Sequence, residues 1–202
     1  IMVGTQMIGK GLDFPDVTLV GVLSLDQALF AGDFRSYERT FSLITQVVGR
    51  SGRGDTAGRA ILQTFLPNHY VLQLAAQQNY PVFYEQEYAI RKTMLFPPFC
   101  DLCILGFVGE KEETVAAAAA EAVRQIQVYV KEQAFSYPLW VLGAVPCHYE
   151  RLKGKYRYPV ILKCKNTSPY RTLIRAVLEA VTAQKAFAKL YLYADMNGDI
   201  GV

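Results

Sequence analysis

Gln46-Val47-Val48-Gly49-Arg50-Ser51-Gly52-Arg53 is the stretch of this sequence from which its fold and function are best approached. It follows residues 35–48, in which apolar side chains recur every three to four positions and therefore predict one buried face of a helix. The apolar positions are Tyr37, Phe41, Ile44 and Val48. Gly49 is expected to end that helix. Arginine is always charged and carries a rigid fork of donors that matches phosphate oxygens, so Arg50 and Arg53 predict a phosphate-binding helix end.

Two interpretations of this arginine pair are open. Basic residues at a helix C-terminus are favoured by the helix macrodipole alone. Alternatively, Gly49 and Gly52 have no side chains and allow a nucleotide to approach the backbone closely. An arginine at such a place stabilises charge on a phosphoryl group during its transfer. The additional Gln46 makes the pattern Gln-x-x-Gly-Arg-x-x-Arg more specific than two arginines, which favours the nucleotide site.

This pattern resembles motif VI of the superfamily 2 helicases. The stretch Gly4-Thr-Gln-Met-Ile-Gly-Lys-Gly-Leu-Asp-Phe-Pro-Asp-Val-Thr-Leu-Val20 resembles motif V of the primosomal replication-restart helicases, the PriA family. The resemblance runs to the C-terminus and is most specific in the first third of the chain. It implies that Arg53 is an arginine finger, that Arg50 contacts the γ-phosphate, and that Gln46 orients the pair and the attacking water. Gly49 would lie against the nucleotide.

Motif V carries the second group of candidate site residues. By resemblance, Thr5, Gln6 and Lys10 face the DNA backbone, while Gly11 and Asp13 lie toward the nucleotide, where Asp13 bonds ribose or orients an arginine. The same loop nearly matches a Walker A motif. It has Gly11 where that motif needs the Ser or Thr that holds magnesium, so a Walker A motif is excluded. A plain strand-to-helix turn is the structural alternative.

Length and composition allow one large domain or two small ones. The chain has 202 residues, of which 51% are hydrophobic, enough for a packed core and too many for a disordered chain. No apolar run reaches the eighteen or so residues that span a membrane. Residues 1–3 favour a strand already in progress, so we expect a fragment of a longer protein. The net charge of +3 arises entirely in residues 99–202, which suggests an anionic partner there.

The order of predicted elements divides the chain into three parts. Residues 1–66 predict strands at 1–5, 17–25 and 59–65 around the 35–48 helix, an α/β pattern with a mostly parallel sheet. The resemblance implies that this is part of a RecA-like P-loop NTPase lobe. Residues 17–25 are nearly all apolar, as in a central strand covered on both faces. Residues 67–98 predict a helical connector, with an interruption near Pro81.

Residues 99–202 predict a second, α+β domain. Strands are expected at 100–108, 140–145, 157–165 and 189–195, and helices at 110–133 and 169–184. That order, β-α-β-β-α-β, is the split arrangement of ferredoxin-like folds.

Residues 149–165 form the densest basic segment, with six basic side chains and one acidic side chain. Basic side chains neutralise phosphates, and the interleaved tyrosines can stack on bases. The segment around Lys153-Gly154-Lys155 is expected to be the tip between two strands. The candidate nucleic-acid contacts are Arg151, Lys153, Lys155, Tyr156 and Arg157. A solvated hairpin whose tyrosines belong to the core is the alternative.

The cysteine pattern does not predict a metal site in this chain. Cys100 and Cys103 are three positions apart on an expected strand, where their side chains point to opposite faces. Cys147 and Cys164 form no second close pair, so we expect four unpaired thiols, as in a cytoplasm. The resemblance implies zinc in the complete protein, bound by cysteine clusters that precede this chain.

The resemblance implies the C-terminal part of an ATP-dependent 3′-to-5′ DNA helicase that recognises stalled replication forks and restarts replication by primosome assembly in the bacterial cytoplasm. ATP and magnesium would be bound jointly with another lobe, so the chain alone is expected to be inactive. The implied partners are forked and single-stranded DNA, the single-stranded DNA-binding protein and other primosome proteins, with no membrane. Two alternatives are another superfamily 2 repair or recombination translocase, and a non-enzymatic docking module. For docking, Arg171 and Arg175 are candidate contacts.

Overall fold

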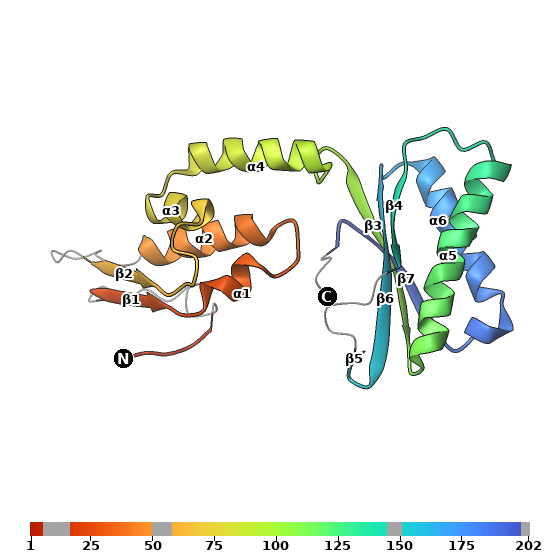
Figure 1. The fold of residues 1–202 in the computed structure, drawn as a ribbon, viewed down its shortest axis with the longest axis horizontal. Helices are drawn as coiled ribbons and strands as arrows, with labels where there is room; N and C mark the ends of the chain where they lie inside the picture. Colours follow the sequence, from red (N-terminus) through yellow and green to blue (C-terminus); the bar gives the residue numbers. More distant parts are fainter. Residues whose placement is uncertain (6–16, 50–57, 145–150, 199–202) are drawn as a thin grey trace. The chain divides into compact units, whose positions relative to one another are not determined.

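The computed structural model describes residues 1–5, 17–49, 58–144 and 151–198 (Figure 1). They form two compact units, Ile1–Ile90 and Arg91–Val202, and both units contain helices and a sheet. We describe each unit by itself. Within the described ranges, none of the helices combines the length and the hydropathy that crossing a membrane requires.

The first unit is built on two parallel strands. Leu19 pairs with Arg59 and Val22 with Leu62, so both strands run in the same direction, as the α/β pattern predicts. Helices α1 to α4 contribute to its core, in which Phe41 of α2 stacks on Phe83 of α4 with ring centroids 4.2 Å apart. The elements are β1 (Leu19–Val22), α1 (Leu25–Leu29), α2 (Ser36–Val48), β2 (Arg59–Leu62), α3 (Tyr70–Ala76) and α4 (Tyr80–Met94).

Two strand predictions for this unit are wrong. Residues 1–5 form no strand, and their side chains are exposed. The strand predicted at 17–25 is shorter, because Leu25 already begins α1. β1 is also not covered on both faces: within the described residues it pairs only with β2, and the Leu19 side chain is 58% exposed. Apolar runs predict burial on both faces only when enough neighbouring elements cover the strand.

Helix α2 begins beside a buried carboxylate. The Asp33 carboxylate accepts a hydrogen bond from the Arg35 backbone N–H at 3.2 Å and pairs with Arg39 at 3.1 Å. Negative charge near a helix N-terminus is favourable because the macrodipole is positive there. Phe41 and Ile44 face the core, which is the face that the spacing of apolar residues predicts.

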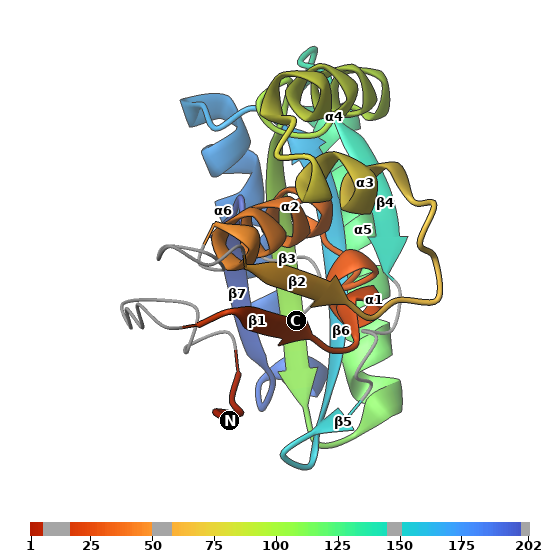
Figure 2. The same ribbon diagram turned by 90° about the vertical axis from the view of Figure 1, so that its left-hand side faces the viewer.

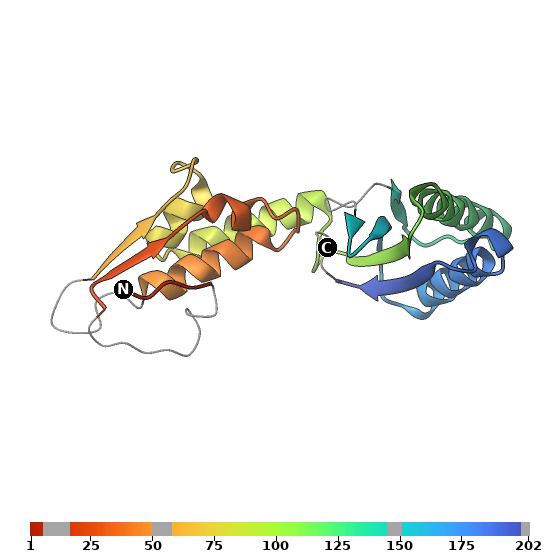
Figure 3. The same ribbon diagram turned by 90° about the horizontal axis from the view of Figure 1, so that it is seen from below.

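The second unit is an antiparallel sheet with two helices on one face (Figures 1 and 3). The strands lie in the order β4-β6-β3-β7, and β5 pairs with β6 (Figure 2). The β-α-β-β-α-β order of the main elements agrees with the prediction, with β5 as an additional short strand. The elements are β3 (Asp101–Gly109), α5 (Glu112–Glu132), β4 (Trp140–Ala144), β5 (Arg151–Leu152), β6 (Lys155–Cys164), α6 (Ser168–Thr182), the 3₁₀ helix η2 (Lys185–Phe187) and β7 (Tyr191–Met196).

The core of this unit lies between the sheet and the pair α5 and α6. From β3 it takes Cys103, Leu105 and Phe107, every second residue, as expected for one face of a strand. From α5 it takes Ala118 and Ala119, both fully buried, because small side chains let the helix lie close to the sheet.

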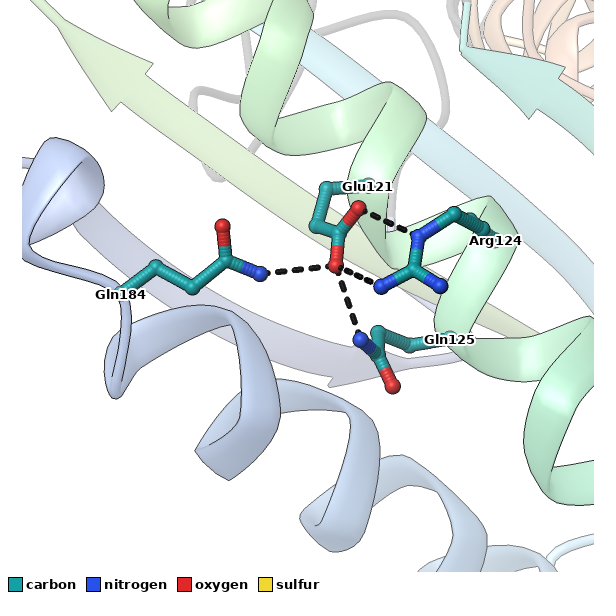
Figure 4. Close-up of polar contacts among 4 residues, drawn as sticks. All are labelled: Glu121, Arg124, Gln125 and Gln184. Atoms are coloured by element: carbon teal, nitrogen blue, oxygen red, sulfur yellow. Dashed lines mark hydrogen bonds and ion pairs between the residues drawn. The ribbon is translucent and has the colours of Figure 1, made fainter.

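One polar cluster joins α5 to the segment that follows α6 (Figure 4). Oε1 of Glu121 accepts hydrogen bonds from Arg124 at 2.6 Å, from Gln125 at 2.8 Å and from Gln184 at 2.7 Å. The Arg124 and Gln125 donors hold the pKa of Glu121 well below its usual 4.5, at about 2. Since η2 and β7 follow Gln184, this carboxylate also anchors the approach to the last strand.

Candidate nucleic-acid interface

Three residues of the expected motor site lie in the described part of the chain. Thr5 is exposed and belongs to no helix or strand. Gln46 is exposed on the last turn of α2, and Gly49 ends that helix, as predicted, with its N–H bonded to the Thr45 carbonyl at 3.0 Å. The remaining candidates, Gln6, Lys10, Gly11, Asp13, Arg50 and Arg53, lie outside the described residues.

Asp26 and the C-terminal end of α2 lie at opposite ends of the small parallel sheet. Asp26 lies at the carboxyl ends of β1 and β2, where it accepts a 2.8 Å hydrogen bond from the Thr64 hydroxyl and further bonds from the Phe65 N–H. Helix α2 runs back along the sheet, and its C-terminal end lies where the strands begin (Figures 1 and 3). Gly49 and Asp26 therefore do not share a site, although ligands of parallel sheets commonly bind at the carboxyl ends.

The basic segment of the second unit forms a β-hairpin with a two-residue turn. β5 and β6 pair through Arg151 opposite Tyr156 and Leu152 opposite Lys155. The turn consists of Lys153 and Gly154, with φ values of 50° and 79°. A type I′ turn needs positive φ at both central residues and favours glycine. The hairpin tip predicted from sequence is confirmed.

The hairpin distributes its cations over both faces of the sheet. The guanidinium of Arg151 lies over the Tyr156 ring, 5.5 Å from its centroid. Tyr156 is half-buried against the core between sheet and helices, so its ring is not fully open to a base. Lys155 and Arg157 alternate with Tyr156 along β6 and therefore point to the opposite face. Nε of Arg157 is buried and has no hydrogen-bond partner among the described residues.

Two lysines that the sequence groups with the hairpin are remote from it. Lys163 donates to the Met94 carbonyl and lies 4.3 Å from the centroid of the Phe96 ring. Lys165 donates to the Phe99 carbonyl at 3.2 Å. Lys165 follows Lys155 by ten positions of extended chain, about 33 Å, which is more than three Debye lengths at physiological salt. The cations of the basic segment therefore gather at the hairpin, on both faces of the sheet, and do not form a continuous strip along β6.

An apolar groove of about 640 Å³ lies between α6 and β7. Its lining includes Ile174 and Leu178 of α6 and Met196 of β7. Arg171 and Arg175, the candidate docking contacts, are one helical turn apart and also line it, as does the acidic Glu179. Nε of Arg171 donates to the Asn166 side chain at 2.9 Å, which fixes its direction.

Three of the four cysteines are buried in the described part of the chain. Cys100, Cys103 and Cys164 are unpaired thiols, and burial raises the pKa of Cys103 to about 12 and that of Cys164 to about 11. Among the residues that the structure describes, no group of His, Cys, Asp and Glu is arranged to hold a metal ion. Cys147 lies outside those residues.

Sequence reasoning missed one feature of the second unit, a pair of tyrosines on the outer face of β7. Tyr191 and Tyr193 are two positions apart on a strand and so share a face; their ring centroids are 5.7 Å apart. The Tyr-Leu-Tyr alternation was the available signal. Its significance depends on the strands beside it, which the sequence does not reveal.

Comparison with known proteins identifies relatives along nearly the whole chain. The family model described as primosomal protein N C-terminal domain matches residues 92–197. A protein from Bacillus subtilis (strain 168) named replication restart protein PriA is 39% identical over 197 residues, 98% of this chain and 24% of that protein. Proteins of the same name are 36% identical in Chlamydia muridarum, over 98% of this chain and 25% of theirs, and 31% identical in Haemophilus influenzae, over 96% and 26%. The chain thus spans about a quarter of the length of these curated relatives.

Proposed function

This chain belongs to the primosomal protein N C-terminal domain family, and on that premise we propose that it is the C-terminal part of an ATP-dependent 3′-to-5′ DNA helicase that restarts stalled replication forks in the bacterial cytoplasm. The observation that carries the proposal is the similarity of 98% of the chain to proteins named replication restart protein PriA. That shared name favours replication restart over another superfamily 2 translocase.

In this proposal the first unit is part of a RecA-like motor lobe and the second is a ferredoxin-like domain. The parallel pair β1 and β2 with α2 supports the first assignment, and the strand order β4-β6-β3-β7 with two helices on one face supports the second. The longer protein would supply the phosphate-binding lysine, the magnesium-binding carboxylates and the zinc-binding cysteines. This chain would supply contacts to both nucleotide and DNA.

The C-terminal end of α2 and the residues that follow it act on the nucleotide. Gln46 and Gly49 are exposed at the end of that helix, which is compatible with close approach of a triphosphate. Arg53 acts as the arginine finger and Arg50 contacts the γ-phosphate, because guanidinium groups offset negative charge on a transferring phosphoryl group. ATP and magnesium are bound jointly with the second lobe, so the 202-residue chain alone hydrolyses no ATP.

The hairpin acts on the DNA backbone. Arg151, Lys153 and Lys155 are exposed at and beside the turn, so their ammonium and guanidinium groups can reach phosphates. Such contacts depend on charge and geometry and not on base sequence. This suits a protein that must act at forks of any sequence.

The test of this proposal uses the full-length protein, a branched DNA substrate, and two readouts. In the variant Arg53→Ala, ATP hydrolysis should fall about a thousandfold or more, the effect of removing an arginine finger, and unwinding should fall with it. Fork affinity should stay within about twofold, since the proposal assigns Arg53 to the nucleotide and not to DNA. Arg59→Ala, which removes an exposed cation at the start of β2, is the matched control and should change neither quantity.

Two outcomes would reject the motor assignment. One is an equal loss of ATP hydrolysis and fork binding in Arg53→Ala, since that would show a structural role. The other is robust ATP hydrolysis by the purified 202-residue chain, which would mean that no second lobe is needed.

A second, non-enzymatic role is favoured by the groove between α6 and β7. Its lining is mainly apolar and includes Arg171 and Arg175, with Glu179 as an acidic member. It fits a short peptide with apolar and acidic side chains, and the acidic tail of the single-stranded DNA-binding protein is the candidate ligand. Other primosome proteins are further candidates. Pro169, near the start of α6, adds no charge to this pair.

Peptide binding tests this role without DNA. A labelled acidic tail peptide should bind the chain, and Arg175→Ala should weaken it about tenfold, because a charge-assisted hydrogen bond is lost. Lys189→Ala, an exposed cation ahead of β7, should leave the affinity unchanged. Equal weakening by both variants would indicate general charge attraction and no docking groove.

A further inference from the structure

The face of the second-unit sheet that points away from α5 and α6 carries an ordered set of side chains near the hairpin. Strand register places Tyr191 of β7 beside Val108 of β3, and Val108 beside Arg157 of β6. These three residues form one row across the sheet. Two residues further along, Tyr193, Gly106 and Pro159 form a second row. We refer to these six residues as the terminal rows.

Gly106 determines how one of the tyrosines lies. A Cβ atom at position 106 would be 2.1 Å from Cζ of Tyr193 and 2.6 Å from its hydroxyl, far inside van der Waals contact. The Tyr193 ring therefore lies across the backbone of β3, in space that any other residue at 106 would occupy. This places the ring on the outer face, since residue 106 alternates with the core residues 105 and 107.

The two rings form a surface and not a slot. Their centroids are 5.7 Å apart with an interplanar angle of 34°. A base inserted between them needs about 7 Å, twice the 3.4 Å spacing of stacked bases. A base therefore fits on the outward side of the rings and not between them. Tyr191 is 65% exposed, so its ring has a face available for stacking.

Two cations, Arg157 and Lys155, lie close enough to these rings to hold the phosphates next to a stacked base. Arg157 is in the same row as Tyr191 and two strands away, which is about 10 Å. Lys155 precedes Arg157 by two residues and points to the same face. Among the described residues of β3, β6 and β7, the acidic side chain on this face is Asp195, in the row beyond Tyr193.

We propose that the terminal rows, with the adjacent Lys155, bind single-stranded nucleic acid, with a base stacked on Tyr191 and the adjoining phosphates held by Arg157 and Lys155. Stacking on exposed aromatic rings beside a cationic track is how single strands are held without sequence preference. A duplex buries the faces of its bases in its own stack and cannot use the rings. The proposal rests on the proposed function in one respect, that DNA is the ligand, and it names the strand form that this surface selects.

The test compares single-stranded and duplex DNA on the 202-residue chain. Fluorescence anisotropy of a labelled oligothymidylate, which has no structure of its own, should show Tyr191→Ala binding about tenfold more weakly, the loss of one stacked base. Tyr191→Phe should bind like the unmodified chain, because the ring remains. Duplex affinity and the salt dependence of single-strand binding should be unchanged in Tyr191→Ala, since no phosphate contact is removed.

Two further variants sharpen the result. Gly106→Ala removes no aromatic or charged group, yet it should weaken single-strand binding because it displaces the Tyr193 ring; circular dichroism checks that the variant is folded. Tyr84→Ala, an exposed tyrosine on α4, is the matched control and should have no effect.

Three outcomes would overturn the inference. They are an oligothymidylate affinity unchanged by Tyr191→Ala, an equal loss for single strand and duplex, or no binding of the single strand by the chain. Each leaves the motor assignment standing, because that assignment is judged by ATP hydrolysis in Arg53→Ala. Selective loss of a protein partner in Tyr191→Ala, with single-strand affinity intact, would assign the surface to protein docking instead.

Discussion

Replacing Glu121 with Gln tests whether one carboxylate fastens the last part of the second unit to α5. The change keeps the size of the side chain and removes its charge. The carboxylate accepts hydrogen bonds from Arg124, Gln125 and Gln184, and its side chain is only 15% exposed. In the variant, Gln125 and Gln184 lose a charged acceptor. We expect Glu121→Gln to fold but to be less stable.

The magnitude follows from the pKa of Glu121, which lies at about 2 and not at 4.5. A pKa lowered by about 2.5 corresponds to roughly 3.4 kcal/mol of stabilisation at neutral pH. Arg124, the first cause of that lowering, is 58% exposed, and solvent screens such a pair strongly. We therefore expect a loss of about 1–2 kcal/mol, the contribution of hydrogen bonds to a charged group.

The pH dependence has a defined sign. The folded protein holds Glu121 ionised at pH values where the unfolded chain protonates it, so the stabilisation is complete above about pH 4.5 and is lost as pH falls toward 2. The gap in stability between the natural chain and Glu121→Gln should therefore be widest near pH 7 and close at low pH.

Urea unfolding measures this gap, because the single tryptophan, Trp140, lies in the same unit as Glu121. Its fluorescence reports that unit alone. Glu132→Gln, on the last turn of α5 and exposed, is the matched control and should shift stability by less than about 0.5 kcal/mol. Equal stability of Glu121→Gln and the natural chain at pH 7, or a gap that persists unchanged at pH 2.5, would refute the reasoning.

Three further predictions concern other parts of the chain. Tyr70→Phe removes the 2.9 Å hydrogen bond to the buried Glu87 carboxylate and should lower stability by about 1–2 kcal/mol, measured by thermal unfolding; an unchanged midpoint would contradict it. Gly154→Ala places a side chain at a φ of 79° and should cost about 1 kcal/mol, measured by urea unfolding; a stabilised variant would show that the turn is not type I′. Cys103 and Cys164, with pKa values of about 12 and 11, should be alkylated at pH 8 at least a hundredfold more slowly in the folded than in the unfolded chain, measured by peptide mass spectrometry; equal rates would refute their burial.

The predictions from sequence that succeed rest on local patterns. Helix α2 and its end at Gly49 follow from a spacing of three to four residues and one glycine. The hairpin follows from a glycine between basic residues and β-forming tyrosines. The order of elements in the second unit follows from alternating periodicities.

The predictions that fail, and the features that were missed, depend on contacts between distant residues. Residues 1–5 have strand-like composition but form no strand, because composition does not supply a partner. Gln184 meets Glu121 across 63 positions. Tyr191 meets the row of Arg157 only through the register of three strands. The nearness of Lys155 and Lys165 in sequence predicted one basic patch, but an extended strand separates them by about 33 Å.

The salt dependence of DNA binding tests the central claim that the hairpin of the second unit holds DNA through its cations. The measured quantity is the slope of log Kd against log salt concentration for single-stranded DNA bound to the 202-residue chain. We expect this slope to fall by about 2 when Lys153, Lys155 and Arg157 are all changed to Glu, because each phosphate contact contributes about 0.7. Changing Lys163 and Lys165, at and just beyond the other end of β6, to Glu should leave the slope nearly as it was. An unchanged slope in the hairpin variant would contradict the account, because the hairpin would then be a solvated turn with no part in binding.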